Sequence, residues 1–361
     1  MTRTEKILGG IDLDTAVGLE VGALDNPIVP PDTPGIFYVD HVDTPTLREK
    51  YKEHPNVNLD KLVEVNGVWG EKTLAEAAAS VAPVDFFVAS HVIEHVPNLI
   101  GWLQEIDSVL KPGGHVGLAV PDRRFTFDYL RRETGLAEVL TAHLAKVRTP
   151  MVQQIIDHFE NVTKVDAGKA WAGTLDRSSL EKHHTAAEMM KVVEDALQNG
   201  SYHDVHCWVF TPLSFALLMG RLAELEYHCF ACHRFHDSEL NTYEFFVSME
   251  RVPDAKGAAA SWHRLAAQIE QGEVEKAAKA AELAAARARE PVEQKLAQSA
   301  EHIGRLQHQI ELLQHELKSQ KYEIEVGQAE IAHLHTSMSA LKASTSWRVT
   351  APLRAFRRIF R

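Results

Sequence analysis

Short apolar runs alternate with amphipathic segments over about the first 120 residues of the chain. Five runs predict strands and two segments predict short helices: strands at 16–22, 36–39, 61–65, 86–89 and 115–120, helices at 46–51 and 73–80. A longer amphipathic segment joins the last two strands and stops at Lys111-Pro112-Gly113-Gly114. A strand, a crossover helix and a second strand indicate parallel pairing, so this region predicts a doubly wound α/β fold.

Helical periodicity dominates the next region, residues 123–205. Apolar residues recur three and four apart, as in Leu136, Val139 and Leu140. The region is too long for a loop between two strands, and we expect a helical insert over the carboxyl ends of the strands. A final helix is predicted within 208–225, followed by two antiparallel strands at 227–233 and 243–249.

The composition changes after residue 252. Residues 253–295 are rich in Ala, Glu and Lys and predict a helical linker, and residues 296–343 carry a heptad repeat. Its two seams consist of Ile303, Ile310, Leu317, Ile324, Ile331 and Met338, and of Leu306, Leu313, Leu334 and Leu341, with Gln320 and Gly327 interrupting the second. This pattern predicts a coiled coil and a homo-oligomer. The alternative is a single amphipathic helix packed on the first domain.

Charge and composition narrow the class of protein. A formal net charge of −12 argues against nucleic acid as the partner, because phosphate binding relies on Lys and Arg. The three cysteines are too few for a disulfide framework, and the N-terminus has no apolar signal core. We expect a cytoplasmic protein, with peripheral contact to the inner face of the plasma membrane as a further possibility.

The segment from Asp85 to Gly114 reads DFFVASHVIEHVPNLIGWLQEIDSVLKPGG. It resembles the segment that follows strand four in class I S-adenosylmethionine (SAM) methyltransferases of the type 11-like group. The resemblance implies a Rossmann-like, seven-stranded methyltransferase sheet over residues 1–252, with SAM as the cofactor. It further implies a transferase of the EC 2.1.1 class, whose ligands lie beyond the carboxyl ends of the strands.

Glu20-Val21-Gly22 resembles the first motif of this family, although the further glycines of that motif are replaced in Gly22–Pro27. A bacterial subgroup with a similar variant motif makes the departure a family variation. By the same resemblance, Glu20, Gly22, Asp40, Asn66 and Ser90 are the expected cofactor-binding residues. Asp40 would accept hydrogen bonds from both ribose hydroxyls and Asn66 would face the adenine amino group. The alternatives are turn capping by Glu20 and an Asx-turn at Asp40.

His91, Glu94 and His95 are spaced i, i+3 and i+4, which places them on one face of a helix that begins at once. This spacing could hold a divalent metal, and it resembles the EVxEH motif of metal-assisted O-methyltransferases such as the ubiquinone and small-RNA 2′-O-methyltransferases. His91 replaces a carboxylate there, which makes a Mg²⁺-type oxygen site less natural. We favour a non-metal interpretation and assign no metal ligand.

In that interpretation His91, His95 and Asp122 are the catalytic residues, with His91 as a general base toward an acceptor hydroxyl. Arg123 and Arg124, directly after Asp122, suit an anionic substrate. Alternatively the two arginines pair with Asp122 and Asp128. His183-His184 and His203-Asp204-x-His206 are further metal-ligand candidates, but no repeated spacing singles them out.

The last residues, 344–361, combine aromatic residues with arginines and predict a basic amphipathic tail. Its stretch STSWRVTAPLR resembles a tail found on bacterial proteins of cell-surface polysaccharide assembly, including glycosyltransferases. That resemblance implies a saccharide or glycan acceptor, and contact with a membrane or a glycosyltransferase. The expected function is O-methylation in polysaccharide biosynthesis. The alternative is an inactive methyltransferase-fold scaffold that organises a glycan-assembly complex through its coiled coil.

Overall fold

One mixed sheet organises the computed structural model, which describes residues 1–354. Its strand order is β3-β2-β1-β4-β5-β7-β6, with β1 to β5 parallel and β7 antiparallel to both β5 and β6. The strands are β1 (Gly18–Val21), β2 (Ile36–Asp40), β3 (Gly67–Val68), β4 (Val84–Ser90), β5 (Leu110–Pro121), β6 (Phe230–His236) and β7 (Glu244–Arg251). The doubly wound, seven-stranded α/β fold predicted from the sequence is therefore confirmed.

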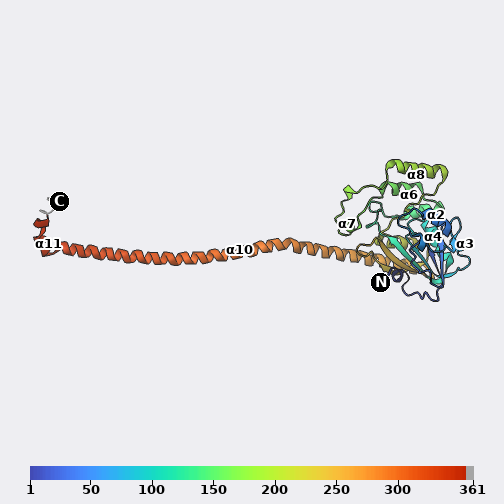
Figure 1. The fold of residues 1–361 in the computed structure, drawn as a ribbon. Helices are drawn as coiled ribbons and strands as arrows, with labels where there is room; N and C mark the ends of the chain where they lie inside the picture. The colour runs from blue at the N-terminus through green and yellow to red at the C-terminus, as the bar shows by residue number, and fades with distance from the viewer. Residues whose placement is uncertain (355–361) are drawn as a thin grey trace. The chain divides into compact units, whose positions relative to one another are not determined.

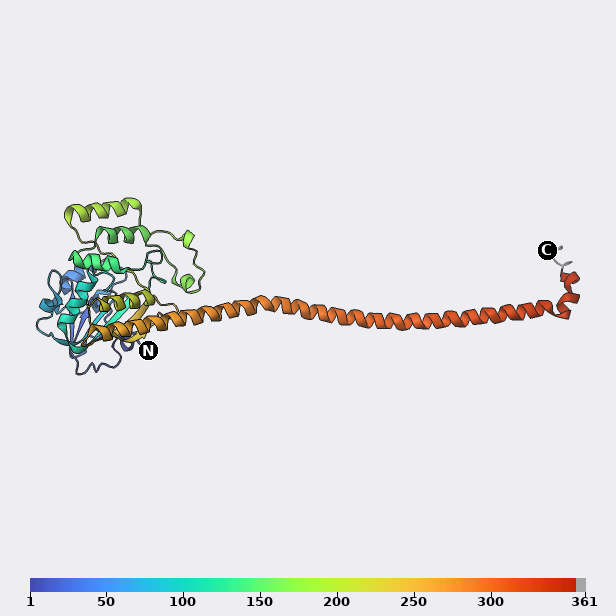
Figure 2. The ribbon, with the colours of Figure 1, turned by 180° about the vertical axis from the view of Figure 1, so that it is seen from behind.

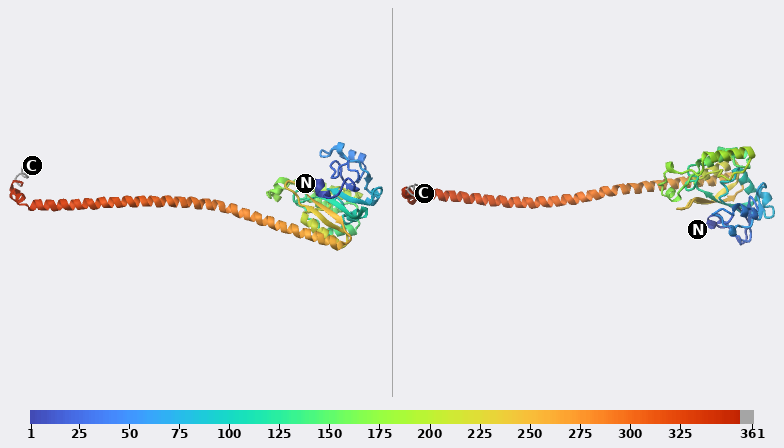
Figure 3. Two further views of the ribbon diagram at one scale, coloured as in Figure 1. Left: turned by 90° about the horizontal axis from the view of Figure 1, so that it is seen from below. Right: turned by 45° about the horizontal axis from the view of Figure 1, so that its top comes forward.

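Helices connect and cover these strands, as Figures 1 and 2 show from opposite sides. The helices before residue 125 are α1 (Arg3–Leu8), α2 (Thr44–Tyr51), η1 (Leu59–Lys61), α3 (Leu74–Ala77) and α4 (Leu99–Val109). Those between β5 and β6 are α5 (Leu136–Leu144), α6 (Val152–Asn161), α7 (Ala167–Trp171), η2 (Arg177–Ser179), α8 (Ala186–Asn199) and α9 (Pro212–Glu224). The first five of this second group form the expected helical insert, shown in green from two further angles in Figure 3.

The third strand was predicted at the wrong place. The apolar run 61–65 does not pair, and β3 consists of Gly67 and Val68, whose partners are Val39 and Asp40 of β2. Val63 is instead buried against Ala23 and Tyr38, and its N–H donates to the Leu24 carbonyl oxygen at 3.0 Å. The run is therefore apolar because it packs on the connection after β1.

The segment after β4 also differs from the expectation, since α4 begins only at Leu99. Pro97 disfavours the helical conformation for the residue before it, and the Asn98 side chain caps the helix by accepting from the Gly101 N–H at 2.9 Å. Residues 91–97 form turns, so His91, Glu94 and His95 do not share a helix face. The assumption of a helix starting at once was wrong.

Both faces of the sheet are covered. The large core contains Phe87 and Val116 from the sheet, Leu103 from α4 and Phe215 from α9, while Ile7 and Leu8 of α1 pack with Phe86, Val88 and Phe246. The N-terminal helix α1 is thus part of the core.

A single helix, α10 (Ala255–Ala343), follows the sheet, and a short helix, α11 (Thr345–Val349), follows α10. The chain divides into two compact units, Met1–Glu275 and a second that begins at Lys276. Trp262, in the first turns of α10, is fully buried in the core of the first unit. None of the described helices is long and apolar enough to cross a bilayer. The tail residues 355–361 lie outside the described part of the chain.

Candidate functional site

Three residues line up at one edge of the sheet. In the parallel register Val21 of β1 is the partner of both Val39 of β2 and Ala89 of β4. The next residue of each strand is Gly22, Asp40 and Ser90, respectively, so these residues form a row across the carboxyl ends of β1, β2 and β4. The structure therefore brings together three of the five residues predicted to bind the cofactor, at the edge where ligands of doubly wound sheets lie.

Gly22 has φ +70°, a conformation that residues with a Cβ rarely adopt. An added Cβ would lie 2.8 Å from the Val92 Cγ2 atom, so a larger residue does not fit without movement of this loop. Gly22, the one glycine that remains of the first motif, is thus at a position where the backbone and the neighbouring Val92 side chain require a residue without a Cβ.

Glu20 is buried and accepts two backbone hydrogen bonds, from the Ile28 N–H at 2.7 Å and the Val29 N–H at 2.8 Å. Burial raises the pKa of this carboxyl to about 7, against the lowering by the two N–H donors. The side chain holds the connection after β1 in place, as the capping alternative describes. A role of Glu20 toward the cofactor stays a prediction.

Asp40 and Asn66 differ in what their side chains contact. Asp40 Oδ1 accepts from the His41 N–H at 2.7 Å and lies 2.6 Å from His41 Nδ1. Asn66 precedes β3, and its Oδ1 accepts from the Tyr38 N–H at 2.9 Å. The amide oxygen of Asn66 thus continues the pairing of β2, and contact with adenine stays a prediction.

A polar network that the sequence did not reveal joins the N-terminus to this edge. One guanidinium nitrogen of Arg3 donates to Ser90 Oγ at 2.9 Å and to Glu244 Oε2 at 2.8 Å. The same Glu244 oxygen lies 3.0 Å from His91 Nε2. Nothing in the spacing of Arg3 or Glu244 indicated this contact, because it depends on where α1 packs against β5 and β7.

His91 lies directly after β4 with φ +53°, in the left-handed region. Burial alone lowers its pKa, but the carboxylates of Glu244 and Glu94 outweigh that effect and raise the pKa to about 9. A histidine with this pKa carries its proton at neutral pH. In this arrangement His91 is held as a cation rather than as a free base.

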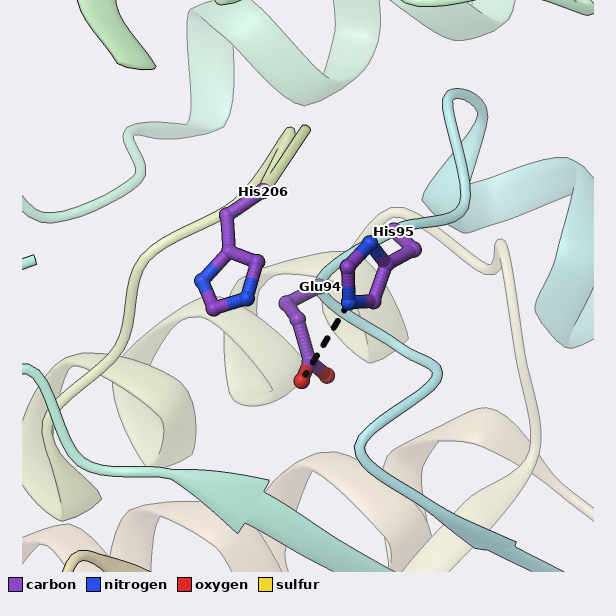
Figure 4. Close-up of side chains that lie close together, drawn as sticks. All are labelled: Glu94, His95 and His206. Carbon is purple, nitrogen blue, oxygen red and sulfur yellow. Dashed lines mark ion pairs between the residues drawn. The ribbon is translucent and has the colours of Figure 1, made fainter. Parts of the chain in front are cut away.

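Three side chains from two distant segments converge beside His91: Glu94 and His95 from the turns after β4, and His206 from the segment before α9 (Figure 4). Their ligating atoms all lie within 4.8 Å of one another. Glu94 is fully buried, His206 nearly so, and the His95 side chain is about one-third exposed. Each of the three was a candidate metal ligand in the sequence, but the sequence did not indicate that they lie close together.

Asp122 and the two arginines after it form a separate group. Asp122 is fully buried and accepts from the Arg124 guanidinium at 2.6 and 3.0 Å and from Ser238 Oγ at 2.8 Å. Arg124 also pairs with Asp237 at 3.2 Å, and Arg123 donates to the Arg131 carbonyl oxygen at 2.6 Å. These contacts correspond to the alternative in which an arginine pairs with Asp122, whereas Asp128 pairs with Arg131 instead. Catalysis by Asp122 and substrate binding by Arg123 and Arg124 stay predictions.

Residues 42–226, more than half of the 361 residues, match the protein family described as "Methyltransferase domain". The chain belongs to this methyltransferase domain family. Membership confirms the expected class of enzyme, a SAM-dependent methyltransferase, and the expected cofactor. At the edge of the sheet Gly22 has no Cβ to block the approach of a ligand, and Asp40, the last residue of β2, offers a carboxylate that can accept hydrogen bonds. These residues are compatible with that cofactor, and their contact with it stays a prediction.

Solved structures match the chain at low sequence identity and low TM-score. A structure described under Zn-dependent alcohol dehydrogenases from Rhodobacter sphaeroides has 13% identity and a TM-score of 0.39, covering 69% of this chain and 89% of that one. A SAM-dependent methyltransferase from Methanosarcina mazei also matches, with 14% identity and a TM-score of 0.33, covering 67% of this chain and 94% of that one. Another, from Aquifex aeolicus, has 14% identity and a TM-score of 0.31 and covers 69% of this chain and 89% of that one. A search of curated proteins finds no match to the sequence.

Proposed function

We propose that the chain transfers the methyl group of SAM to a hydroxyl of a sugar or glycan intermediate in bacterial cell-surface polysaccharide biosynthesis. The observation that best supports methyl transfer is the row of Gly22, Asp40 and Ser90 at the carboxyl edge of the sheet, in a chain that belongs to the methyltransferase domain family. The substrate class is supported by the tail, whose wording resembles tails on proteins that assemble surface polysaccharides. In the described part of that tail, the Arg354 guanidinium stacks 3.7 Å from the centre of the Trp347 ring.

Within this proposal Glu20 and Gly22 shape the turn beside the cofactor, Asp40 accepts from the ribose hydroxyls, and Asn66 and Ser90 complete the pocket. His91, His95 and Asp122 lie around the reacting atoms or position the residues that contact those atoms. Arg123 and Arg124 face an anionic part of the acceptor. Alignment of acceptor and sulfonium matters at least as much as proton removal, because methyl transfer from a sulfonium is intrinsically downhill. His91 acts as a base only after Glu244 or Glu94 has moved away from it.

A scaffold without turnover is the second function that an observation favours. Ser90 accepts from Arg3, and the connection after Gly22 lacks the usual glycines. Both features would let the edge of the sheet keep its shape without the cofactor. The fold would then serve to hold partners together through the second unit of the chain.

We further propose that this second unit forms a coiled coil between copies of the chain. Among the described residues of α10, the seam positions Ile303, Leu306, Ile310, Leu313, Leu317, Ile324, Ile331, Leu334, Met338 and Leu341 are all exposed. An exposed apolar stripe at heptad spacing is stabilised by pairing with a second such stripe. Contact of the tail with an anionic membrane or with a glycosyltransferase is part of the same proposal.

Isothermal titration of the purified protein with SAM and with its demethylated product tests the proposal. Binding of both at micromolar concentration, followed by transfer of labelled methyl groups to nucleotide sugars or glycans, would support the enzyme. Binding without transfer to any saccharide would remove the substrate class. Absence of binding would favour the scaffold.

A further inference from the structure

We propose that Glu94, His95 and His206 form a binding site for one divalent transition-metal ion. The proposal goes beyond methyl transfer, because it concerns metal binding alone and requires no turnover. Its starting point is the convergence of one carboxylate and two imidazoles whose ligating atoms lie within 4.8 Å of one another (Figure 4).

Glu94 is the first argument for an ion. Its side chain is fully buried, and within the described residues neither carboxylate oxygen accepts a hydrogen bond. The nearest imidazole nitrogens are His91 Nδ1 at 3.4 Å and His95 Nε2 at 3.9 Å. Burial of a carboxylate without hydrogen bonds is strongly unfavourable, whereas a bound cation satisfies it directly.

The two histidines are held in the orientation that a metal ligand requires. His95 Nδ1 lies 2.8 Å from Asp204 Oδ1, and His206 Nδ1 lies 2.6 Å from Asp128 Oδ2. A carboxylate beside Nδ1 keeps the proton on that nitrogen, which leaves the Nε2 lone pair free to bind. Carboxylate–histidine–metal arrangements orient zinc ligands in this way.

Each supporting carboxylate is itself positioned. Asp128 is buried and accepts from the Arg131 guanidinium at 2.9 Å, and Asp204 accepts from the Tyr202 hydroxyl at 3.2 Å. Figure 4 shows a nitrogen of each ring turned toward the Glu94 carboxylate. The ring centroids of His95 and His206 are 4.8 Å apart and their planes nearly perpendicular, at 87°. The rings therefore converge on one point without stacking.

The backbone ties the two segments together independently of any ion. The Cys207 N–H donates to the Glu94 carbonyl oxygen at 2.6 Å, and the Trp208 indole N–H donates to the Val96 carbonyl oxygen at 2.6 Å. His206 is thus fixed next to Glu94 by main-chain contacts on its carboxyl side. A site of this kind is preformed and loses little conformational entropy on binding.

The ligand set selects the class of metal. Two imidazoles and one carboxylate suit Zn²⁺ or Fe²⁺, and they hold catalytic ions with open coordination positions, whereas Mg²⁺ and Ca²⁺ prefer oxygen ligands. Bonds of about 2.0–2.1 Å place tetrahedral ligands roughly 3.3 Å apart, so an ion would draw these side chains inward by about 1 Å. The partly exposed His95 gives an ion access from solvent.

The competing interpretation is a cluster of ion pairs, in which protonated histidines neutralise Glu94 and no metal binds. Cobalt titration of the full-length, chelator-treated protein separates the two. One equivalent of Co²⁺ with visible ligand-field absorption, displaced by Zn²⁺, is the expected result. Glu94→Gln and His206→Gln should each weaken Co²⁺ binding by more than ~100-fold, because loss of an outer-shell partner alone costs about 10–100-fold.

His203→Gln is the matched control, since His203 lies three residues from His206 but pairs with Asp195 at 2.8 Å. This variant should bind Co²⁺ like the wild type. If the wild type binds no Co²⁺, or if both site variants bind it unchanged, the proposal fails. Cys229 and Cys232 form a Cys-x-x-Cys pair, which could also bind the metal. Loss of binding in a Cys229→Ser, Cys232→Ser double variant with the site variants unaffected would therefore also overturn the proposal.

X-ray absorption of the Co²⁺-loaded wild type decides the matter even where a variant does not fold. A first shell of nitrogen and oxygen with imidazole scattering is expected, and sulfur in the first shell would contradict the site. Cofactor titration is a separate measurement, so failure of SAM binding and failure of metal binding are distinguishable.

Discussion

At Asp40 a single carboxylate could serve two purposes. One oxygen is occupied by the N–H and the ring of the next residue, His41, whereas an Asx-turn would accept from the residue after that. The position of Asp40 beside Gly22 and Ser90 is what favours a ribose contact in addition. The contact with His41 and the proposed contact with the ribose are therefore distinguished by SAM binding, which only the ribose contact would strengthen.

Asp40→Ala should weaken SAM binding by roughly 1–3 kcal/mol, the range for losing hydrogen bonds to a charged partner. Titration calorimetry measures the affinity, with far-ultraviolet circular dichroism to check the fold. Asp60→Ala, at an exposed position after α2, is the control and should bind SAM normally. Unchanged affinity of the Asp40 variant would remove the ribose assignment.

His228 gives a pH-dependent prediction at the residue scale. It is buried, and its Nε2–H donates to the Met219 carbonyl oxygen at 3.0 Å while Nδ1 accepts from the Phe230 N–H at 3.1 Å. Burial lowers its pKa to about 4. The unfolded chain therefore binds a proton that the folded chain does not between pH 6.5 and 4, and stability falls as the pH falls through this window.

The free energy of unfolding should lose about 2 kcal/mol from this residue between pH 7 and pH 5. Urea titrations at the two pH values measure it, and in His228→Gln the difference between them should shrink by that amount. Other groups contribute equally to both proteins. An identical pH difference in wild type and variant would contradict the neutral, buried state of His228.

At the scale of elements, the start of α10 belongs to the fold of the first unit. Trp262 is fully buried against Phe215, and its indole N–H donates to the Phe230 carbonyl oxygen at 2.7 Å. The Ser261 hydroxyl accepts from the Cys232 N–H at 2.8 Å. The sequence placed a domain boundary at residue 252, and that boundary stays a prediction; residues 253–275 share the compact unit that ends at Glu275.

Trp262→Ala should destabilise the protein by about 3–5 kcal/mol, the usual cost of removing a buried aromatic side chain. Urea unfolding monitored by circular dichroism measures the change. Leu283→Ala, at an exposed position of the same helix, is the control and should change stability by less than about 0.5 kcal/mol. A small effect of the Trp262 variant would show that the first unit is complete without α10.

At the scale of the whole molecule, the exposed seam of α10 predicts self-association. The full-length chain should be an oligomer in light scattering, and a chain truncated after about Pro291 should be a monomer. Leu313→Lys should shift the full-length chain toward monomer, whereas Glu311→Lys, outside both seams, should not. A monomeric full-length protein would remove the coiled coil.

The sequence by itself determined the order of strands and helices along the chain, the helical insert and the heptad repeat. Each of these features follows from a local spacing of apolar residues. It also placed Asp40 and Ser90 at strand ends, since a strand's end is a local feature. It could not place β3 correctly, because the buried run 61–65 and a paired strand have the same composition.

Tertiary structure alone decided which side chains meet. Glu94 and His206 are brought together by the packing of the segment before α9 on the turns after β4, and Arg3 reaches Ser90 because α1 packs across the sheet. Such contacts depend on how elements that are distant in the chain pack together, and the local spacing of apolar residues does not indicate that packing. Glu94 is buried without a hydrogen bond, and the carboxylates of Glu244 and Glu94 raise the pKa of His91, only once those elements have packed.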